Sequence, residues 1–550
     1  MKHLARVPLT LAVLLAPPVG ADGGFTDIQK IDDVEGGLGA VLFNGDLFGD
    51  AVSRIGDLNG DGVNDLAVGA PQAPGSSTGG AVFILLLDTD GTVQAREKIL
   101  APAGTVDFGR SLARLGDVDG DGVQDIAAGG TSGGVGIVHV LFLNPDGTLK
   151  FSTGTVGTDS SFGAALCGLG DLDGDGIPDL AIGEPAPGFL PSGGRIWIHV
   201  LNAAGEASPL TSIGPGQGGF LGALDNGDLF GSSLARVGDL DGNGTQDVAV
   251  GAPGDDDGAA GNTGALWILF LEVDGTVLLE QKVSNLNGNL GVVLTGGQDF
   301  ATSLGRLGDF DLDGVGDLIV GTPVSDGTIW LLLMNADGTV RVTLPYTAQD
   351  LGALPGDGFG TAVTGIGDLD GSGTPELVVG APTSAGGGVD RGAVLVAFPE
   401  GAQAAQILPY GCDINAAMSL QTTGLPIPGS TMEFLLDNPL GSQTPSATLP
   451  VLAVSLTGVG SPCGIQVPGW SMDPALPGAE LLVTLPTAVP LLLGTPWTGA
   501  GNPVAIELEL PAAPALLGLS AFVQGALVDA DPAAAIPIAL TRARELVFGI

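Results

Sequence analysis

The chain has 550 residues, of which 61 are acidic and 17 are basic, and its formal net charge is −44. This balance disfavours nucleic-acid binding, because affinity for a phosphate backbone rests largely on Lys and Arg. Apolar residues make up 44% of the chain, which is enough for a packed core and argues against disorder.

The first residues are typical of an export signal. Lys2 and Arg6 give a charged start, Val7–Leu15 is apolar, and Val19-Gly20-Ala21 fits a cleavage site. The apolar stretch is too short to span a bilayer. We therefore expect residues 1–21 to be a signal peptide that is cleaved after Ala21, and the protein to be secreted or displayed at the cell surface.

Six near-copies of a nine-residue loop occupy the next part of the chain. The first reads Asp57-Leu-Asn59-Gly-Asp61-Gly-Val63-Asn-Asp65. Ca²⁺ takes six to eight oxygen ligands, several of them charged, and the side chains at positions one, three, five and nine supply such oxygens. Glycine after position five permits a sharp turn. The backbone carbonyl at position seven is expected to add a further oxygen, so the sequence predicts five to six calcium sites.

The predicted ligands stand at positions one, three, five, seven and nine of each loop. They are Asp57, Asn59, Asp61, Val63 and Asp65; Asp117, Asp119, Asp121, Val123 and Asp125; Asp171, Asp173, Asp175, Ile177 and Asp179; Asp239, Asp241, Asn243, Thr245 and Asp247; Asp309, Asp311, Asp313, Val315 and Asp317; and Asp368, Asp370, Ser372, Thr374 and Glu376. Charge ranks the second, third and fifth loops as the strongest sites and the sixth as the weakest. The alternative interpretation is a set of solvated turns that bind no metal.

The loops recur at intervals of 54 to 70 residues, and each interval contains four short strands. In the first repeat we expect strands at Ala51–Ile55, Asp65–Val68, Ala81–Leu87 and Val93–Ile99. This is the pattern of a β-propeller blade, which buries its faces only against neighbouring blades. The fold prediction is all-β with six blades, and a partial seventh stays open. Either residues 25–31 or residues 402–408 could close the ring.

Each loop stands between a Phe-Gly phrase and a Gly-Ala-Pro-like phrase. Examples are Phe48-Gly49 with Gly69-Ala70-Pro71, and Phe230-Gly231 with Gly251-Ala252-Pro253. Together they resemble the FG-GAP repeat of the integrin α-subunit β-propeller, over roughly residues 25–410. Repeat five departs from the pattern with Phe300-Ala301. The resemblance implies propeller blades, calcium in the loops, and a role in cell adhesion or ligand binding.

Composition changes near Tyr410, where the acidic loops stop and Pro and Leu increase. We expect residues 22–410 to form the propeller and residues 411–550 to form a β-sandwich, with strands at Leu449–Leu456, Glu480–Leu485 and Val504–Leu510. Residues 510–528 lack charge, but several Pro and Gly residues argue against a membrane-spanning helix. A disulfide between Cys412 and Cys463 is one possibility that the sequence leaves undecided.

Few residues are suited to catalysis. His139 and His199 fall in apolar strands and are expected to be core residues, as is the thiol of Cys167. The chain has no nucleophile elbow beside a suitable histidine and no phosphate-binding Gly-Lys-Ser/Thr loop. We therefore predict no catalytic residue. Polysaccharide cleavage stays open, because two free carboxylates suffice for it.

An arginine stands three residues before the loop-opening Asp in four of the repeats. These are Arg54, Arg114, Arg236 and Arg306, whereas repeats three and six have Gly168 and Gly365. One interpretation is a partial ring of arginines that faces the channel and meets an anionic ligand. The interpretation that we favour is a local salt bridge or hydrogen bond that orients the neighbouring loop.

The leading functional hypothesis is a secreted calcium-binding propeller that mediates adhesion or binds an extracellular protein or glycan. The alternatives are an extracellular polysaccharide hydrolase or lyase, with its site in the propeller, and a structural component of a surface layer or matrix. No nucleic-acid partner and no membrane span are expected.

Overall fold

The computed structural model describes residues 25–399, apart from 74–78, 187–192, 258–260, 312, 325 and 386, and most strands between Gln406 and Val547. The predicted signal peptide, Cys412 and Cys463 lie outside the described residues. The chain divides into two compact units at residues 401 and 402, which are described separately.

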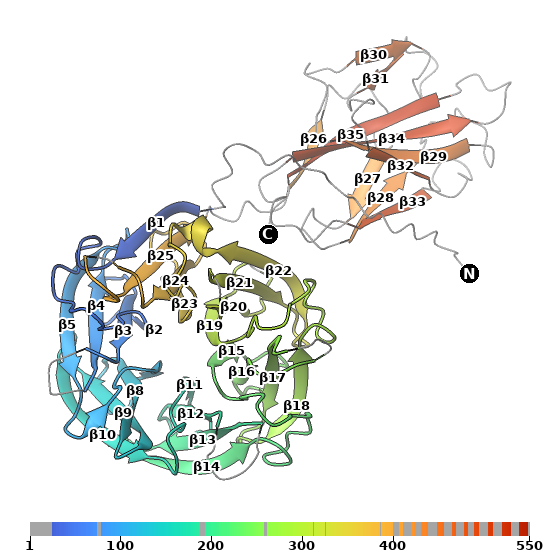
Figure 1. The fold of residues 1–550 in the computed structure, drawn as a ribbon. Coiled ribbons are helices and arrows are strands. Elements are labelled where there is room, and N and C mark those ends of the chain that lie inside the picture. Colours follow the sequence, from blue (N-terminus) through green and yellow to red (C-terminus); the bar gives the residue numbers. More distant parts are fainter. Residues whose placement is uncertain are drawn as a thin grey trace. The chain divides into compact units, whose positions relative to one another are not determined.

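The first unit is a ring of six blades, each an antiparallel sheet, which confirms the predicted propeller (Figure 1). Blades one to three contain β2 (Ala51–Gly56), β3 (Asp65–Ala70), β4 (Ala81–Leu87) and β5 (Val93–Leu100); β6 (Thr105–Val106), β7 (Leu112–Gly116), β8 (Asp125–Ser132), β9 (Val135–Leu143) and β10 (Leu149–Val156); and β11 (Leu166–Gly170), β12 (Asp179–Glu184), β13 (Arg195–Leu201) and β14 (Ala207–Ile213).

Blades four to six complete the ring. They contain β15 (Leu234–Gly238), β16 (Asp247–Ala252), β17 (Ala265–Leu271) and β18 (Val277–Val283); β19 (Ser303–Gly308), β20 (Asp317–Thr322), β21 (Thr328–Met334) and β22 (Val340–Thr347), followed by the short helix η1 (Ala348–Leu351); and β23 (Val363–Gly367), β24 (Glu376–Ala381) and β25 (Ala393–Pro399) with β1 (Phe25–Ile31).

The N-terminal strand closes the ring. β1 pairs antiparallel with β25 and is the outer strand of blade six, with Ile28 opposite Ala397. The inner strand of blade one, β2, contacts the inner strands of both blade two and blade six. The ring therefore closes with six blades. The other candidate for this position, residues 402–408, overlaps β26 (Gln406–Tyr410), which pairs with β35 (Ile538–Val547) in the second unit.

The blades pack face to face, so their middle strands are buried on both sides. All six residues of β3 and all seven of β4 are buried, whereas the outer strand β5 (VQAREKIL) exposes most of its side chains. Each hydrophobic core cluster combines residues of two neighbouring blades; one joins blades one and six, another joins blades three and four. This explains the continuous apolar runs of the middle strands, because no face meets water.

The Phe-Gly and Gly-Ala-Pro phrases meet across each blade junction. The peptide of Phe108 bridges Gly80 of blade one, and the Phe108 side chain is fully buried. A Cβ atom added to Gly69 of blade one would lie 1.9 Å from the carbonyl oxygen of Gly109 in blade two. Glycine is therefore required where the two backbones touch. The junction between blades six and one has the same arrangement, with Gly380 against the Gly49 carbonyl.

The ring has two distinct faces. In every blade the acidic loop joins the first strand to the second. In blades one to five the hairpin between the third and fourth strands lies at the same end, because the strands are antiparallel. We call this end the carboxylate-loop face. The connections between second and third strands, and those between successive blades, lie at the other end, which we call the opposite face.

The second unit is also built of strands. β26, β35, β34 (Ser520–Asp529), β29 (Thr448–Ser455) and β32 (Val489–Leu493) form one sheet; β27 (Leu420–Thr423), β28 (Thr431–Leu436) and β33 (Val504–Glu509) form a second; and β30 (Ile465–Pro468) pairs with β31 (Gly478–Leu481). The packing of these sheets into a sandwich stays a prediction. No helix among the described residues is long and apolar enough to cross a membrane.

Candidate metal sites and a polar pocket

The acidic loops bring their carboxylates together. In loops two to six, one oxygen from each of positions one, three and nine lies within 4.8 Å of the others. These groups are Asp117, Asp119 and Asp125; Asp171, Asp173 and Asp179; Asp239, Asp241 and Asp247; Asp309, Asp311 and Asp317; and Asp368, Asp370 and Glu376. In the first loop position three is Asn59, whose amide donates to the Asp61 carboxylate at 2.8 Å. Position five is not in these groups.

The same carboxylates also hold the loop backbone. In loop three, the Asp171 carboxylate accepts hydrogen bonds from the N–H groups of Gly174 and Gly176 at 2.8 and 2.9 Å. The N–H of Ile177, at position seven, donates to Asp175 at 2.8 Å. Position seven is thus fixed through its N–H, and its carbonyl as a metal ligand stays a prediction in all six loops.

The carboxylate at position nine is buried and has a second role. Asp179 has no exposed surface; it accepts from the N–H of Leu172 in the loop at 2.9 Å and from the N–H of Leu201, the last residue of β13, at 3.0 Å. Asp65, Asp125, Asp247 and Asp317 make the same two kinds of bond in their own blades. Position nine therefore fastens loops one to five to the third strand of their blades, whereas in loop six Glu376 accepts from the N–H of Leu369 within the loop.

These buried carboxyl groups are costly to ionise without a counter-charge. Burial, with a smaller contribution from the neighbouring loop carboxylates, raises the pKa of Asp65 and Asp125 to about 6 and that of Asp317 to about 7. Burial also raises the pKa of Glu376 to about 7. A cation among these groups would favour the ionised form. A set of converging carboxylate oxygens is the donor set that hard divalent cations take.

Two loops carry a cationic side chain that sequence reasoning missed. The Lys150 Nζ atom, on β10, lies 2.6 Å from Asp119 and 2.7 Å from Asp121. On β22, Arg341 pairs with Asp311 and lies 3.0 Å from Asp313. Each of these residues follows the first position of its outer strand, which lies beside the loop. Loop three has Asp at all four positions and, among the described residues, no such ion pair.

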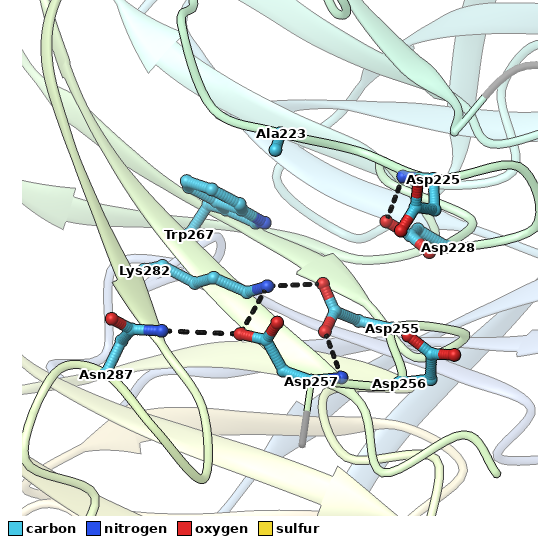
Figure 2. Close-up of a pocket in the computed structure, with 9 residues that line it drawn as sticks. All are labelled: Ala223, Asp225, Asp228, Asp255, Asp256, Asp257, Trp267, Lys282 and Asn287. Atoms are coloured by element: carbon cyan, nitrogen blue, oxygen red, sulfur yellow. Dashed lines mark hydrogen bonds and ion pairs between the residues drawn. The ribbon is translucent and has the colours of Figure 1, made fainter. Parts of the chain in front are cut away.

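A pocket of about 330 Å³ opens on the opposite face at blade four. It receives residues from both neighbouring connections and from the segment after β16. The lining residues are Ala223, Asp225, Asp228, Asp255, Asp256, Asp257, Trp267, Lys282 and Asn287 (Figure 2). They come from three separate loops and from the strands β17 and β18, which is why no local motif predicts the pocket.

Lys282 lies at the centre of the pocket's polar contacts. Its Nζ atom is 2.7 Å from both Asp255 and Asp257 and 5.3 Å from the centre of the Trp267 ring (Figure 2). Burial alone would lower the pKa of Lys282, but the two carboxylates raise it. Trp267 is only 5% exposed, and its indole Nε1 has no hydrogen-bond partner among the described residues. Burial raises the pKa of Asp228 to about 6, with the nearby Asp255 charge contributing.

The opposite face also carries exposed apolar side chains. The seven large apolar residues with the greatest exposure among those described are Val34, Leu221, Val273, Leu286, Val293, Leu354 and Val389. All but Val273 lie on connections at the opposite face. Phe43, which is 57% exposed, lies there too. Exposed apolar groups that collect on one face are typical of an interaction surface.

The residues considered for catalysis are buried. His139 accepts or donates one hydrogen bond with Thr105 at 3.0 Å, and His199 packs against Phe162. Both imidazoles are at most 6% exposed, as expected of core residues. Cys167 is a buried free thiol, and burial raises its pKa to about 11.

The four arginines bear out the local interpretation only in part. Arg54 donates to Asn64 at 3.1 Å, and Arg114 donates to Gln124 at 2.9 and 2.7 Å. Asn64 and Gln124 occupy position eight of the adjacent loops, so these bonds can orient the loops as expected. Among the described residues, none of the four arginines forms a salt bridge.

Comparison with known proteins supports the repeat assignment. The FG-GAP repeat model matches residues 48–85 and 230–269, and the FG-GAP-like repeat model matches residues 117–182. The chain is 32% identical to integrin alpha-3 of Cricetulus griseus over 176 residues, 30% of this chain and 17% of that protein. It is 30% identical to integrin alpha-5 of Xenopus laevis over 231 residues, 40% of this chain and 20% of that protein.

The matched region is a small part of those relatives: the chain spans no more than a fifth of the length of these integrin α subunits. Among solved structures, a chain described as BBS1N in complex with ARL6DN, soaked with lead, aligns with 68% of this chain and 97% of its own length, at 14% identity and a TM-score of 0.31. The six blades, the junctions between them and the repeat matches all indicate the same repeat architecture. The chain carries FG-GAP repeats, similar to those of integrin α subunits, arranged as a six-bladed β-propeller.

Proposed function

We propose that this protein is a secreted or cell-surface propeller that binds Ca²⁺ in its acidic loops and binds an extracellular protein or glycan on its opposite face. The role would be adhesion or ligand binding. The observation that carries the proposal is the division between the two faces. The acidic loops lie on one face, whereas six of the seven most exposed large apolar side chains among the described residues and the polar pocket lie on the other.

The loops would hold the metal through positions one, three and nine. In loop three these are Asp171, Asp173 and Asp179. When bound, Ca²⁺ would supply positive charge that offsets repulsion between the carboxylates. Because position nine also fastens the loop to β13, a loaded loop would couple the metal to the blade.

The opposite face offers two kinds of contact. Exposed side chains such as Leu221 and Val293 can bury apolar surface against a partner. The pocket offers several carboxylates, which can hydrogen-bond a hydroxyl-rich sugar or a basic side chain. Loops on a rigid ring are a common arrangement for recognition.

The test is a screen of the purified chain, with calcium, on glycan arrays and extracellular-protein arrays. Leu221→Asp and Val293→Asp on the opposite face should abolish the binding of any ligand found. Val273→Asp, on the hairpin between β17 and β18 at the carboxylate-loop face, is the matched control and should bind normally. Binding that is lost in the control but kept in the two face variants would refute the proposed surface.

Polysaccharide cleavage is a second candidate function, favoured by the pocket alone. The carboxyl group of Asp228, with its pKa near 6, could act as a general acid, and a neighbouring carboxylate could complete the pair. A polysaccharide panel scored for new reducing ends or unsaturated products would test this. Turnover that disappears in Asp228→Asn with unchanged calcium content would favour the enzyme, and no turnover on any substrate would favour the binding protein.

A further inference from the structure

The central channel of the ring contains a cluster of arginines that the proposed function does not use. Arg54 on β2, Arg114 on β7, Arg236 on β15 and Arg306 on β19 all line one cavity of about 370 Å³. Each stands three residues before an acidic loop, so the cluster lies toward the carboxylate-loop face. Four different blades thus contribute one guanidinium each to the same space.

A glycine of the neighbouring blade lies beside three of the four guanidinium groups. A Cβ atom built on Gly367 of blade six would lie 3.1 Å from an Arg54 nitrogen. The corresponding distance is 3.5 Å from Gly56 to Arg114 and 3.8 Å from Gly170 to Arg236. The glycine that ends the inner strand of one blade therefore borders the arginine of the next blade for Arg54, Arg114 and Arg236, whereas Gly238, which precedes Arg306, has no atom within 4 Å of such a Cβ. These three side chains lie along the channel wall.

No described carboxylate forms a salt bridge with the arginines of the channel. The only side-chain hydrogen bonds of the cluster among the described residues go to the neutral amides of Asn64 and Gln124. The Nε atom of Arg54 is buried and makes no hydrogen bond. In a chain with 61 acidic and 17 basic residues, unpaired arginines are unexpected, since carboxylates outnumber cations more than threefold.

The arginines of the cluster are close enough to repel one another. Burial, followed by the charges of Arg114, Arg306 and Arg236, lowers the pKa of Arg54 to about 10. A guanidinium group carries its charge at neutral pH. Like charges held together in this way cost free energy unless an anion joins them.

We propose that the loop-side end of the channel binds a small multivalent oxyanion, of the phosphate or sulfate class. Guanidinium groups present paired N–H donors that match the oxygens of such anions. Several arginines around one space can contact a single tetrahedral group from different sides. The anion is either a free ion or the charged ester group at the end of a larger ligand. The proposal does not depend on the ligand surface of the opposite face.

The experiment is calorimetric titration of the full chain, loaded with calcium, with sodium sulfate at low ionic strength. Sulfate is used because calcium phosphate precipitates. Sodium chloride at matched ionic strength serves as the blank. We expect one saturable sulfate site per chain. Absence of saturable binding would overturn the proposal.

The variants Arg236→Gln and Arg306→Gln test the position of the site. Neither arginine makes a side-chain hydrogen bond within the described residues, so neither change removes a contact of the fold. Each should weaken sulfate binding about tenfold, the effect typical of losing a hydrogen bond to a charged group. Arg96→Gln, on the outer strand β5, is the control and should leave the affinity unchanged.

Stability separates a lost site from a damaged fold. Because each substitution relieves repulsion, the melting temperature of the two channel variants should be equal to or above that of the unchanged chain. The double variant, with both Arg236→Gln and Arg306→Gln, should bind sulfate more weakly still. An unchanged sulfate affinity in this double variant would contradict the proposed site in the channel. A sulfated oligosaccharide that binds more tightly than free sulfate would identify the ester of a larger ligand, and equal affinities would identify the free ion.

Discussion

Position nine of acidic loops one to five should stabilise the blade even when no calcium is present, whereas position three should matter mainly when calcium is bound. Loop three gives the cleanest comparison, because it has Asp at all four positions and no ion pair among the described residues. The two substitutions are Asp179→Ala and Asp173→Ala. They remove the same chemical group from places six residues apart.

The structure sets the size of each effect. Asp179 accepts two hydrogen bonds from buried N–H groups, of Leu172 and Leu201. Each unsatisfied buried group costs about 1–3 kcal/mol, so Asp179→Ala should lose about 2–6 kcal/mol in chelator. Asp173 is exposed and accepts one bond from the Asp175 N–H at 3.1 Å, which water can replace. Its substitution should cost less than about 1 kcal/mol in chelator.

Calcium should change the comparison. A bound ion at about a hundredfold excess over Kd adds roughly 2.7 kcal/mol to stability, and Asp173→Ala should lose this gain. Chemical denaturation of both variants and the unchanged chain, with calcium and with chelator, measures all the terms. Equal losses for the two variants in chelator would refute the structural role of position nine.

Three further predictions follow from separate features of the ring. Gly69→Ala should lower the free energy of unfolding by about 3 kcal/mol, because its Cβ would overlap the Gly109 carbonyl. The control Gly45→Ala has no neighbour within 4 Å and should cost only the left-handed backbone strain of about 1 kcal/mol. Similar losses for the two variants in thermal or chemical unfolding would contradict the close contact at the blade junction. Burial lowers the pKa of His199 to about 4, against about 6.5 in an unfolded chain. Between these pH values the unfolded chain binds more protons than the folded chain. The free energy of unfolding should therefore fall by at most about 3 kcal/mol as the pH drops from 6.5 to 4. His199→Phe should reduce that slope, and an unchanged slope would show that other groups cause it. Asp370→Ala should reduce calcium-dependent stability less than Asp173→Ala does, because Ser372 already removes a carboxylate from loop six; the opposite order in melting curves would contradict the ranking by charge.

The blades were predictable from the sequence because their signals are local and repeated. The loop, its flanking phrases and four short strands occur in each period, and the observed strands of blade one agree with the predicted ranges to within two residues. Ring closure was not predictable. Residues 25–31 and 402–408 both have outer-strand patterns, and only the packing of the whole ring distinguishes them.

The rest of the candidate site depends on contacts between distant residues. The second partner of Asp179 lies 22 residues away on β13, so the loop motif alone does not show that position nine fastens the blade. Lys150 meets loop two from 29 and 31 residues away. The pocket joins Asp225 to Asn287 across a whole blade. Such contacts follow from blade closure, which no local pattern specifies.

Calorimetric titration of the metal-free chain with Ca²⁺, followed by melting curves of the same samples, tests the central claim most directly. The account predicts five to six saturable sites, one for each acidic loop or each but the sixth, and a melting temperature that rises as they fill. A chain that takes up no Ca²⁺, or whose melting curves with calcium and with chelator coincide, would contradict it.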